Sequence, residues 1–183
     1  MRSFLAICFA FLVSACAVNN TSSQGGDDAL MLRGYDAVSY FSGAPAIGTR
    51  GNSVNHEGFV YWFASADNRA EFLKNPTRYV PQYGGFCANG MVYAVKLGGL
   101  PNEWKVIDDR LFIFGDPKSK LYFEMDQAKN IVLADGYWTR EAKGASAKLQ
   151  SYKRLFWQVP HYKTGAELER EYQRRQNSLP RQG

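Results

Sequence analysis

The chain has 183 residues, of which 45% are hydrophobic and 15% aromatic, and its formal net charge is +5 at pH 7. This composition excludes a disordered chain and is typical of a globular protein with an aromatic-rich core. The length suffices for one domain with a tail, and the mild positive charge alone identifies no partner.

The N-terminus has the pattern of a secretion signal. Arg2 precedes an uncharged apolar run, residues 4–13, which is shorter than the about 20 residues of a membrane-spanning helix. The run closes with the letters VSAC, ending at Cys16, and these resemble a bacterial lipoprotein processing box. We therefore expect residues 1–15 to be a lipoprotein signal peptide and Cys16 to be lipidated. In the alternative, the signal is an ordinary secretory one and Cys16 is incidental.

The polar, glycine-bearing segment of residues 16–28 predicts a flexible tether. Lipid on Cys16 would make a membrane the partner, because each buried methylene contributes roughly 0.8 kcal/mol. Ala17 stands where an aspartate would favour inner-membrane retention. In a Gram-negative host we therefore expect an exported, lipid-anchored protein on the periplasmic face of the outer membrane. We expect no nucleic-acid partner and leave any protein partner open, whereas the basic surplus can attract anionic lipid headgroups or cell-wall polymers.

The first half of the domain predicts a hairpin and a helix. Residues 52–65 alternate apolar and polar side chains around a turn at residues 57–58, which predicts a β-hairpin. Ser65 stands at an N-cap position, so residues 66–75 predict a helix. Pro76 ends this helix, because the residue before proline disfavours helical dihedral angles.

The second half begins with a loop. Residues 76–90 contain prolines and a glycine pair, which predict an irregular or partly helical segment. Residues 103–115 predict a second hairpin that turns at residues 108–109. We expect residues 119–138 to combine a short strand with a helix around residues 126–134.

Residues 139–183 predict a helical C-terminal extension. Its first helix has apolar residues at helical spacing, namely Leu149, Tyr152, Leu155 and Phe156. Thr164 and Glu167 form a capping-box pattern that begins a second, mostly polar helix, in which Glu171 can pair with Arg175. The elements together predict an α+β fold: a small antiparallel β-sheet of hairpins packed with short helices, plus this extension.

Five stretches of the chain match one known family. They are the letters GYDAVSYF at 34–41, HEGFVYWFAS at 56–65, EFLKNPTRYVPQYGGFCA at 71–88, WKVIDDRLFIF at 104–114 and ADGYW at 134–138. The third stretch is the most specific. Over roughly residues 32–138 the chain resembles the YHS-domain family, in its exported stand-alone form, which implies a small α+β domain with a short antiparallel sheet. We expect this domain to comprise residues 29–138. Residues 139–183 lie outside the resemblance.

The resemblance also implies a role in metal binding. Related small domains occur in copper-transporting ATPases and other metal-handling proteins. In the metal-binding relatives, cysteines lie around the strand-to-helix junction, where this chain has Ala64 and Asn68. A site with several zinc-bound thiolates is therefore not expected.

Cys87 is the one thiol expected in the mature domain, since Cys8 lies in the signal and Cys16 takes lipid. Such a lone thiol in an oxidising compartment survives if it is buried, metal-bound or reactive by design. One interpretation is a soft-metal site for copper, with Cys87, Met91 and His56 as ligands, because Cu(I) favours thiolate, thioether and imidazole donors. The alternative is that Cys87 is a small buried residue, Met91 fills the core and His56 faces water.

A second interpretation is a ligand-binding or envelope-interaction module without a metal. The stretches around Tyr35, Asp36 and Tyr83 would then contribute to an aromatic pocket.

A third interpretation is a thiol-dependent enzyme. Cys87 as a nucleophile would need a base from His56 or His161, which Asp36 could orient. The lack of a Cys-x-x-Cys motif excludes disulfide exchange with a resolving thiol of the same chain. The sequence favours binding over catalysis and leaves the enzyme question open.

Overall fold

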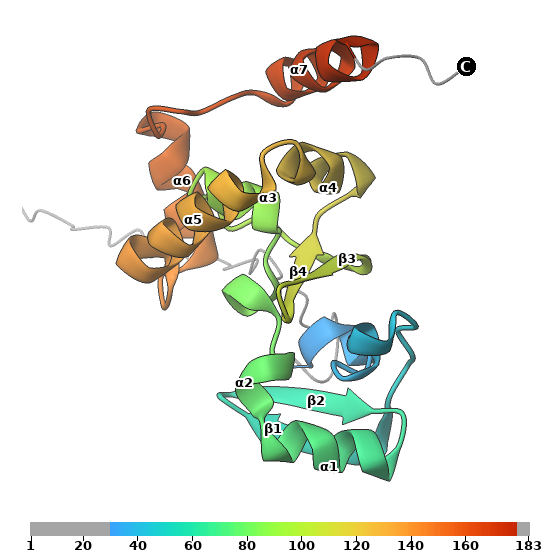
Figure 1. Cartoon of the computed structure of the whole chain (residues 1–183). Coiled ribbons are helices and arrows are strands. Elements are labelled where there is room, and N and C mark those ends of the chain that lie inside the picture. The colour runs from blue at the N-terminus through green and yellow to red at the C-terminus, as the bar shows by residue number, and fades with distance from the viewer. Residues whose placement is uncertain (1–29, 179–183) are drawn as a thin grey trace, which may run out of the picture.

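The structure, a computed structural model, describes residues 30–178. Figure 1 shows two β-hairpins surrounded by helices, with two further helices at the C-terminal end. Strand β1 (Thr49–His56) pairs antiparallel with β2 (Phe59–Phe63), and β3 (Leu100–Ile107) pairs antiparallel with β4 (Arg110–Phe114). The hairpins form two separate two-stranded sheets. The predicted α+β fold with a helical C-terminal extension is confirmed.

The helices of the described residues are short. They are α1 (Ala66–Lys74), α2 (Pro76–Tyr79), α3 (Ala88–Val92), α4 (Pro117–Glu124), α5 (Gln127–Tyr137), α6 (Ala147–Phe156) and α7 (Gly165–Ser178). Three 3-10 segments (Met31–Gly34, Ser39–Ser42, Gln82–Gly85) and a π-helical turn (Trp138–Ala142) complete the regular structure. Within residues 30–178, no helix is both long enough and apolar enough to span a bilayer.

The first hairpin and its helix follow the prediction. Glu57 (φ 49°) and Gly58 (φ 82°) both adopt left-handed backbone angles, which are typical of a two-residue hairpin turn. The Ser65 hydroxyl accepts from the Asn68 amide at 3.1 Å and caps α1. Helix α1 ends before Pro76, which opens α2 as its first residue.

The second hairpin also follows the prediction, whereas the strand expected after residue 119 is wrong. The hairpin turns at Asp108–Asp109, which adopt φ angles of 49° and 59°. Residues 117–137 then form two helices, α4 and α5. The cause is local, because Asp116 and Ser119 form a reciprocal capping box and Pro117 occupies the first helical turn.

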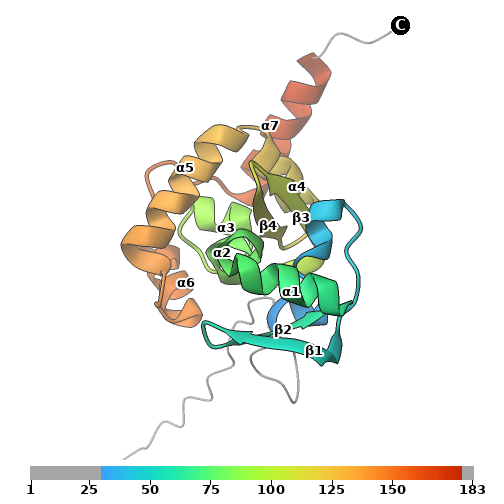
Figure 2. The same cartoon turned by 60° about the horizontal axis from the view of Figure 1, so that its bottom comes forward.

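Two hydrophobic clusters share strand β4. Leu111 and Ile113 pack into the first cluster with β2, α1 and the N-terminal segments, whereas Phe112 and Phe114 pack into the second cluster with α3, α4 and α5. This division follows from the alternation of side chains along a strand. Phe72 is at the centre of the first cluster, where its ring lies 5.0 Å from that of Phe63. Figure 2 shows α1 lying alongside the first hairpin, and it contacts both strands.

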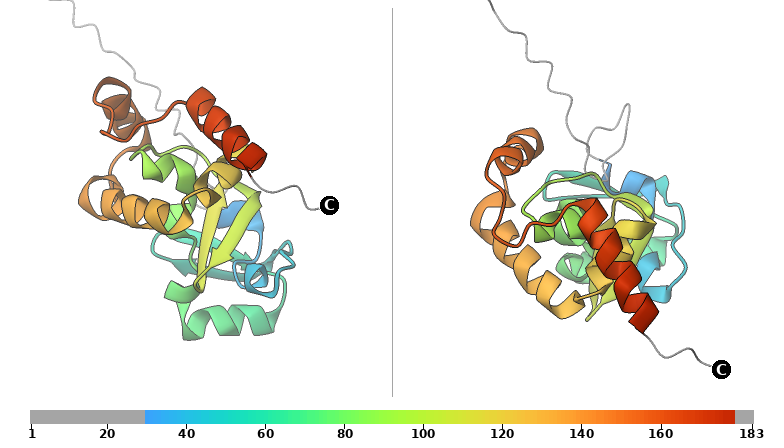
Figure 3. Two further views of the ribbon diagram at one scale, coloured as in Figure 1. Left: turned by 45° about the horizontal axis from the view of Figure 1, so that its top comes forward. Right: turned by 90° about the horizontal axis from the view of Figure 1, so that it is seen from above.

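The C-terminal extension returns to the domain. Figure 3 shows α7 crossing over α4, and the guanidinium of Arg175 donates to the Met125 carbonyl at 2.6 Å. The predicted capping box at Thr164 and Glu167 and the predicted Glu171–Arg175 ion pair are both present.

Candidate functional site: a groove around Cys87

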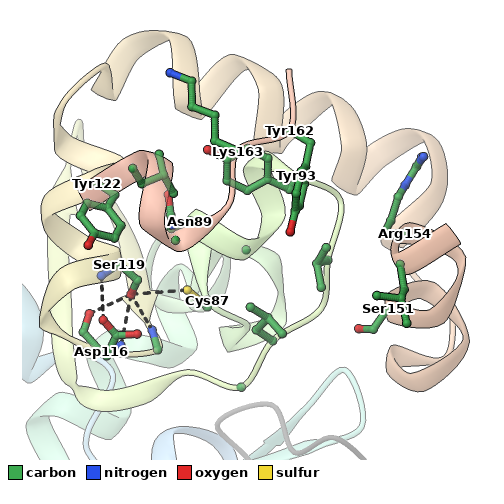
Figure 4. Close-up of a pocket in the computed structure, with 18 of the residues that line it drawn as sticks. Cys87, Asn89, Tyr93, Asp116, Ser119, Tyr122, Ser151, Arg154, Tyr162 and Lys163 are labelled. Atoms are coloured by element: carbon green, nitrogen blue, oxygen red, sulfur yellow. Dashed lines mark hydrogen bonds between the residues drawn. The ribbon is translucent and has the colours of Figure 1, made fainter. Parts of the chain in front are cut away.

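A groove of about 560 Å³ lies between the α+β domain and the C-terminal extension. Cys87 lines its buried end together with Ser119 of α4. Helix α3, residues 93–98 and residues 115–122 complete the domain wall, and the opposite wall comes from α6, α7 and the segment of residues 157–164 that joins them. Figure 4 shows Ser151 and Arg154 of α6 on the side opposite Ser119, with Cys87 between them.

Local backbone bonds fix Cys87 in place. Its amide donates to the Leu97 carbonyl at 2.9 Å, and its carbonyl accepts from the Met91 amide at 3.1 Å as the first turn of α3 forms. Gly115 follows β4 and approaches so closely that an added Cβ would lie 3.6 Å from the Cys87 sulfur. The side chain of Cys87 is 2% exposed.

The thiol of Cys87 has one polar side-chain neighbour. Its Sγ lies 3.7 Å from the Oγ of Ser119, which accepts the S–H. The Ser119 hydroxyl itself donates to the Asp116 carbonyl at 2.8 Å, so its proton is already engaged. Burial raises the pKa of the Cys87 thiol above its ordinary value, although nearby amides and Ser119 oppose this shift. Cys87 is therefore a neutral thiol at neutral pH.

Neither histidine is hydrogen-bonded to Cys87. The Nε2 of His161 lies 2.8 Å from the Val92 carbonyl, and its ring lies 5.8 Å from the rings of Tyr93 and Tyr137. The ring of His56 contacts other aromatic residues, as described next. The geometry around the thiol thus gives no support to a Cys–His nucleophile pair.

The three residues predicted to bind copper do not form one site. Met91 is fully buried in the second core cluster, and His56 packs its ring 5.6 Å from that of Phe72 in the first. Figure 1 shows the first hairpin and α3 at opposite ends of the domain, with β3 and β4 between them. Among residues 30–178, no three His, Cys, Asp or Glu side chains are grouped to hold a metal ion. These residues therefore do not fit a shared copper ion, and copper binding stays a prediction.

Asp36, a predicted pocket residue, instead organises the loop around it. Its side chain is fully buried, and its carboxylate accepts from the Ala64 amide at 2.9 Å, the Val38 amide at 2.9 Å and the Asn68 side chain at 2.6 Å. Ala64 and Asn68 are the positions where the resemblance implies cysteines in metal-binding relatives. In this chain, a carboxylate connects these two positions.

The other two predicted pocket residues lie apart. Tyr35 packs against the first cluster, with its ring 6.5 Å from that of Tyr40. Tyr83 belongs to the second cluster, and its hydroxyl donates to Asp135 at 2.9 Å. Tyr83 also lines a second cavity of about 500 Å³. The structure therefore does not place these side chains in one aromatic pocket.

The charged residues that line the groove are Asp116 of the domain and Arg154 and Lys163 of the extension. The two cations pair with Glu141 and Glu171, respectively. The Nε of Arg154 is buried without a hydrogen-bond partner among the described residues. Burial raises the pKa of Tyr93 to about 12, so its phenol is a neutral donor at the groove wall.

Sequence reasoning did not identify Ser119, Arg154 or Lys163 as site residues. Ser119 had a usable signal, because Asp116 followed three residues later by serine is a capping pattern. Arg154 and Lys163 carried no such signal, since only tertiary packing brings the extension against Cys87.

The chain was compared with protein-family models, curated proteins and solved structures, and none of the three comparisons found a match. The resemblance to the YHS-domain family, like the metal role that it implies, stays a prediction.

Proposed function

We propose that the protein is an exported, lipid-anchored binding protein, and that the groove around Cys87 takes a small amphipathic molecule. The observation that carries this proposal is the groove itself. Its volume of about 560 Å³ falls within the range of roughly 300–1,000 Å³ that is usual for small-molecule sites. Binding without a metal was one of the interpretations left open by the sequence.

The lining favours a ligand with an apolar body. Leu97, Leu155 and Leu168 line the groove, as do the rings of Tyr93 and Tyr162. Leu155 is 66% exposed, so a ligand that covers it gains free energy in proportion to the apolar area removed from water.

The polar groups favour an acceptor or an anion at one end of the ligand. The unpartnered Nε–H of Arg154 is a buried donor, and such a donor is stabilised when it gains an acceptor. Lys163 also lines the groove, but its ammonium pairs with Glu171 and points away from Cys87 (Figure 4). A chain or ring system that carries a carboxylate matches both the apolar lining and the Arg154 donor.

The state of Cys87 favours binding over covalent chemistry. Its thiol is neutral, its neighbour Ser119 accepts rather than donates, and no histidine adjoins it. In this proposal Cys87 is a small, weakly polar wall of the site and not a nucleophile.

The anchor is the second part of the proposal. Residues 1–15 as signal peptide, Cys16 as the lipidated residue and residues 16–28 as tether all lie outside the described residues. The support for them is the sequence pattern at the N-terminus. The location on the periplasmic face of an outer membrane belongs to the same proposal.

Protection of Cys87 tests the groove. The chain from residue 16 onward, carrying Cys16→Ser, retains every described residue and has Cys87 as its one thiol. We expect decanoate, below its micelle concentration, to slow modification of Cys87 by a thiol reagent at least fivefold. Decylamine, with a chain of equal length and the opposite charge, serves as the matched control and is expected to protect less.

Two results would contradict the proposal. Equal protection by decanoate and decylamine would contradict the proposed preference of the groove for an anionic ligand. If calorimetry detects decanoate binding while the reactivity of Cys87 is unchanged, the ligand lies elsewhere and the groove is not its site.

A further inference from the structure

Helix α6 attaches to the domain through polar side chains. Gln150 is 4% exposed, and its side-chain amide donates to the Ala94 carbonyl at 2.9 Å. Arg154 is mostly buried and pairs with Glu141, which lies in the π-helical turn before α6. The inner side of α6 is therefore hydrogen-bonded rather than apolar.

The opposite side of α6 is apolar and faces solvent. We call it the outer face of α6, and it consists of Leu149, Tyr152, Phe156 and the adjoining Trp157. Their side chains are 69%, 51%, 74% and 69% exposed, respectively. The first three are spaced i, i+3 and i+7, so they project from one side of the helix. A surface helix in water normally turns its apolar side to the core, and α6 has the reverse arrangement. A contiguous exposed apolar surface of this kind marks an interaction site.

The charges on α6 favour a membrane as the occupant of this face. Residues 147–156 contain no acidic residue, and of their three basic residues Lys153 and Arg154 pair with Glu141, whereas Lys148 has no ion pair among the described residues. The ammonium of Lys148 lies 6.0 Å from the ring of Tyr152, at the edge of the outer face. Basic side chains beside exposed aromatic and leucine residues are typical of helices that lie in the headgroup region of anionic bilayers.

The position of α6 agrees with the proposed anchor. The described chain begins at Leu30, and its neighbour Met31 lines the same cavity of about 500 Å³ as Ala147, the first residue of α6. The residues from Cys16 to this point span at most roughly 50 Å when fully extended. A lipid on Cys16 would hold α6 within that distance of a bilayer, which raises the effective concentration of the membrane at the outer face.

We propose that the outer face of α6 docks on a phospholipid bilayer that contains anionic headgroups, with the helix lying parallel to the surface. The argument from the tether length rests on the proposed lipid anchor, whereas the exposure of the outer face is independent of it. Because Arg154 and Leu155 of α6 also line the groove, docking would bring the groove next to the membrane, where amphipathic anions such as free fatty acids are found.

Vesicle binding without the lipid isolates this face. The test uses the chain from residue 16 with Cys16→Ser, mixed with vesicles of phosphatidylcholine alone or with one third phosphatidylglycerol, and measures the bound fraction by flotation. We expect binding only to the anionic vesicles, and at least a tenfold weaker partition coefficient for the double variant Phe156→Ser/Trp157→Ser. Lys148→Gln is expected to weaken the partition severalfold.

A matched control removes exposed apolar side chains elsewhere. Val132 on α5 and Leu73 on α1 are 71% and 50% exposed, and Val132→Ser/Leu73→Ser is expected to bind vesicles like the parent chain. Fluorescence from Trp157 should shift to shorter wavelength on binding, and this shift should be absent in Trp157→Phe.

Several outcomes would overturn the inference. Failure to bind anionic vesicles would do so, as would unchanged binding by the Phe156→Ser/Trp157→Ser variant. A dimer in sedimentation that the same variant abolishes would identify the outer face as a self-association surface instead. Protection of Cys87 by decanoate separates the two proposals. If the chain does not bind vesicles but decanoate still protects Cys87, only the docking face is contradicted. If the chain binds vesicles but decanoate does not protect Cys87, only the ligand groove is contradicted.

Discussion

The side chain of Cys87 has one polar side-chain neighbour, Ser119, which accepts the S–H, and the backbone amides of Asn89, Gly90 and Gly115 also act on the sulfur. A thiolate would need donors or a nearby cation to offset its burial. Hydrogen bonds from the backbone amides lower the pKa of the thiol, but desolvation is the larger effect, and the pKa is raised. The residue is thus placed for packing and for contact with a ligand.

The pH dependence of Cys87 modification follows from this raised pKa. Only the thiolate reacts, so the rate should still be rising at pH values where an unburied cysteine, with a pKa of about 8.5, has levelled off. The measurement is the alkylation rate from pH 6 to 10, normalised to the same chain in urea. A rate that levels off below pH 8 would indicate an activated thiolate and would restore the enzyme interpretation.

Asp36 stabilises the fold through hydrogen bonds that its position in the sequence does not predict. Asp36→Asn replaces one acceptor oxygen by a donor group that faces other donors, namely the amides of Val38 and Ala64 and the side chain of Asn68. We expect a loss of about 2–4 kcal/mol in the free energy of unfolding, because buried charged hydrogen bonds are left unmade. Urea denaturation measures this loss.

Asp109→Asn is the matched control for Asp36→Asn. Asp109 is 58% exposed and pairs with Arg78 at 2.9 Å. An exposed pair of this kind contributes less than about 1 kcal/mol. Equal losses from the two substitutions would contradict the role assigned to Asp36.

At the scale of elements, close backbone approach sets the position of the first hairpin. Gly48 precedes β1, and an added Cβ would lie 2.4 Å from the carbonyl carbon of Trp62 in β2. Gly48→Ala should therefore push the two strands apart and destabilise the fold by about 2 kcal/mol or more.

Gly51, within β1, supplies the comparison. An added Cβ there meets no atom within 4 Å, so Gly51→Ala should change stability by less than about 0.5 kcal/mol. Thermal melting of the two variants beside the parent chain measures the difference. If Gly48→Ala and Gly51→Ala have the same melting temperature, the close packing at residue 48 is not rigid.

The elements that were predicted correctly have signals in adjacent residues. The turn at Glu57–Gly58, the cap at Ser65 and the capping box at Thr164 depend only on nearby side chains. The apolar run Leu121–Phe123 has no clear period and fits a strand or a helix equally, so α4 was missed. Its burial is set by distant partners, since Tyr122 meets Tyr172 of α7.

The candidate site was only partly predictable for the same reason. Cys87 was singled out correctly as a residue of interest, and it does line a groove. The companions proposed for it, His56 and Met91, were chosen by residue type and spacing. Its true neighbours, Ser119 and the extension, come from contacts between residues 32 or more positions apart in the chain, which no local pattern encodes.

At the scale of the whole molecule, carboxylates hold the extension over the groove. Glu169 of α7 accepts from Lys118 at 2.7 Å and from Tyr122 at 2.6 Å, both on α4. Arg175 of α7 pairs with Asp126 at 2.8 Å. Because α7 also contributes Leu168 to the groove, the closure of the site depends on these charges.

Acid should therefore release α7 and open the groove. Hydrogen bonds from Lys118, Tyr122 and Gln173 lower the pKa of Glu169 to about 2, whereas a glutamate in an unfolded chain has a pKa of about 4.3. A carboxyl group with a depressed pKa stabilises the docked state above its unfolded pKa, and this stabilisation is lost as pH falls from about 4.3 towards about 2. We expect Cys87 to react faster with 4,4′-dithiodipyridine between pH 5 and 3, relative to a cysteine peptide at each pH.

Two variants test the role of Glu169. Glu169→Gln should give part of this increase in Cys87 reactivity at pH 7. Glu71→Gln, which removes a carboxylate on α1 paired with Lys74, should not. A flat ratio across this range, or a Glu169→Gln variant that reacts like the parent chain, would show that apolar packing alone holds α7 in place.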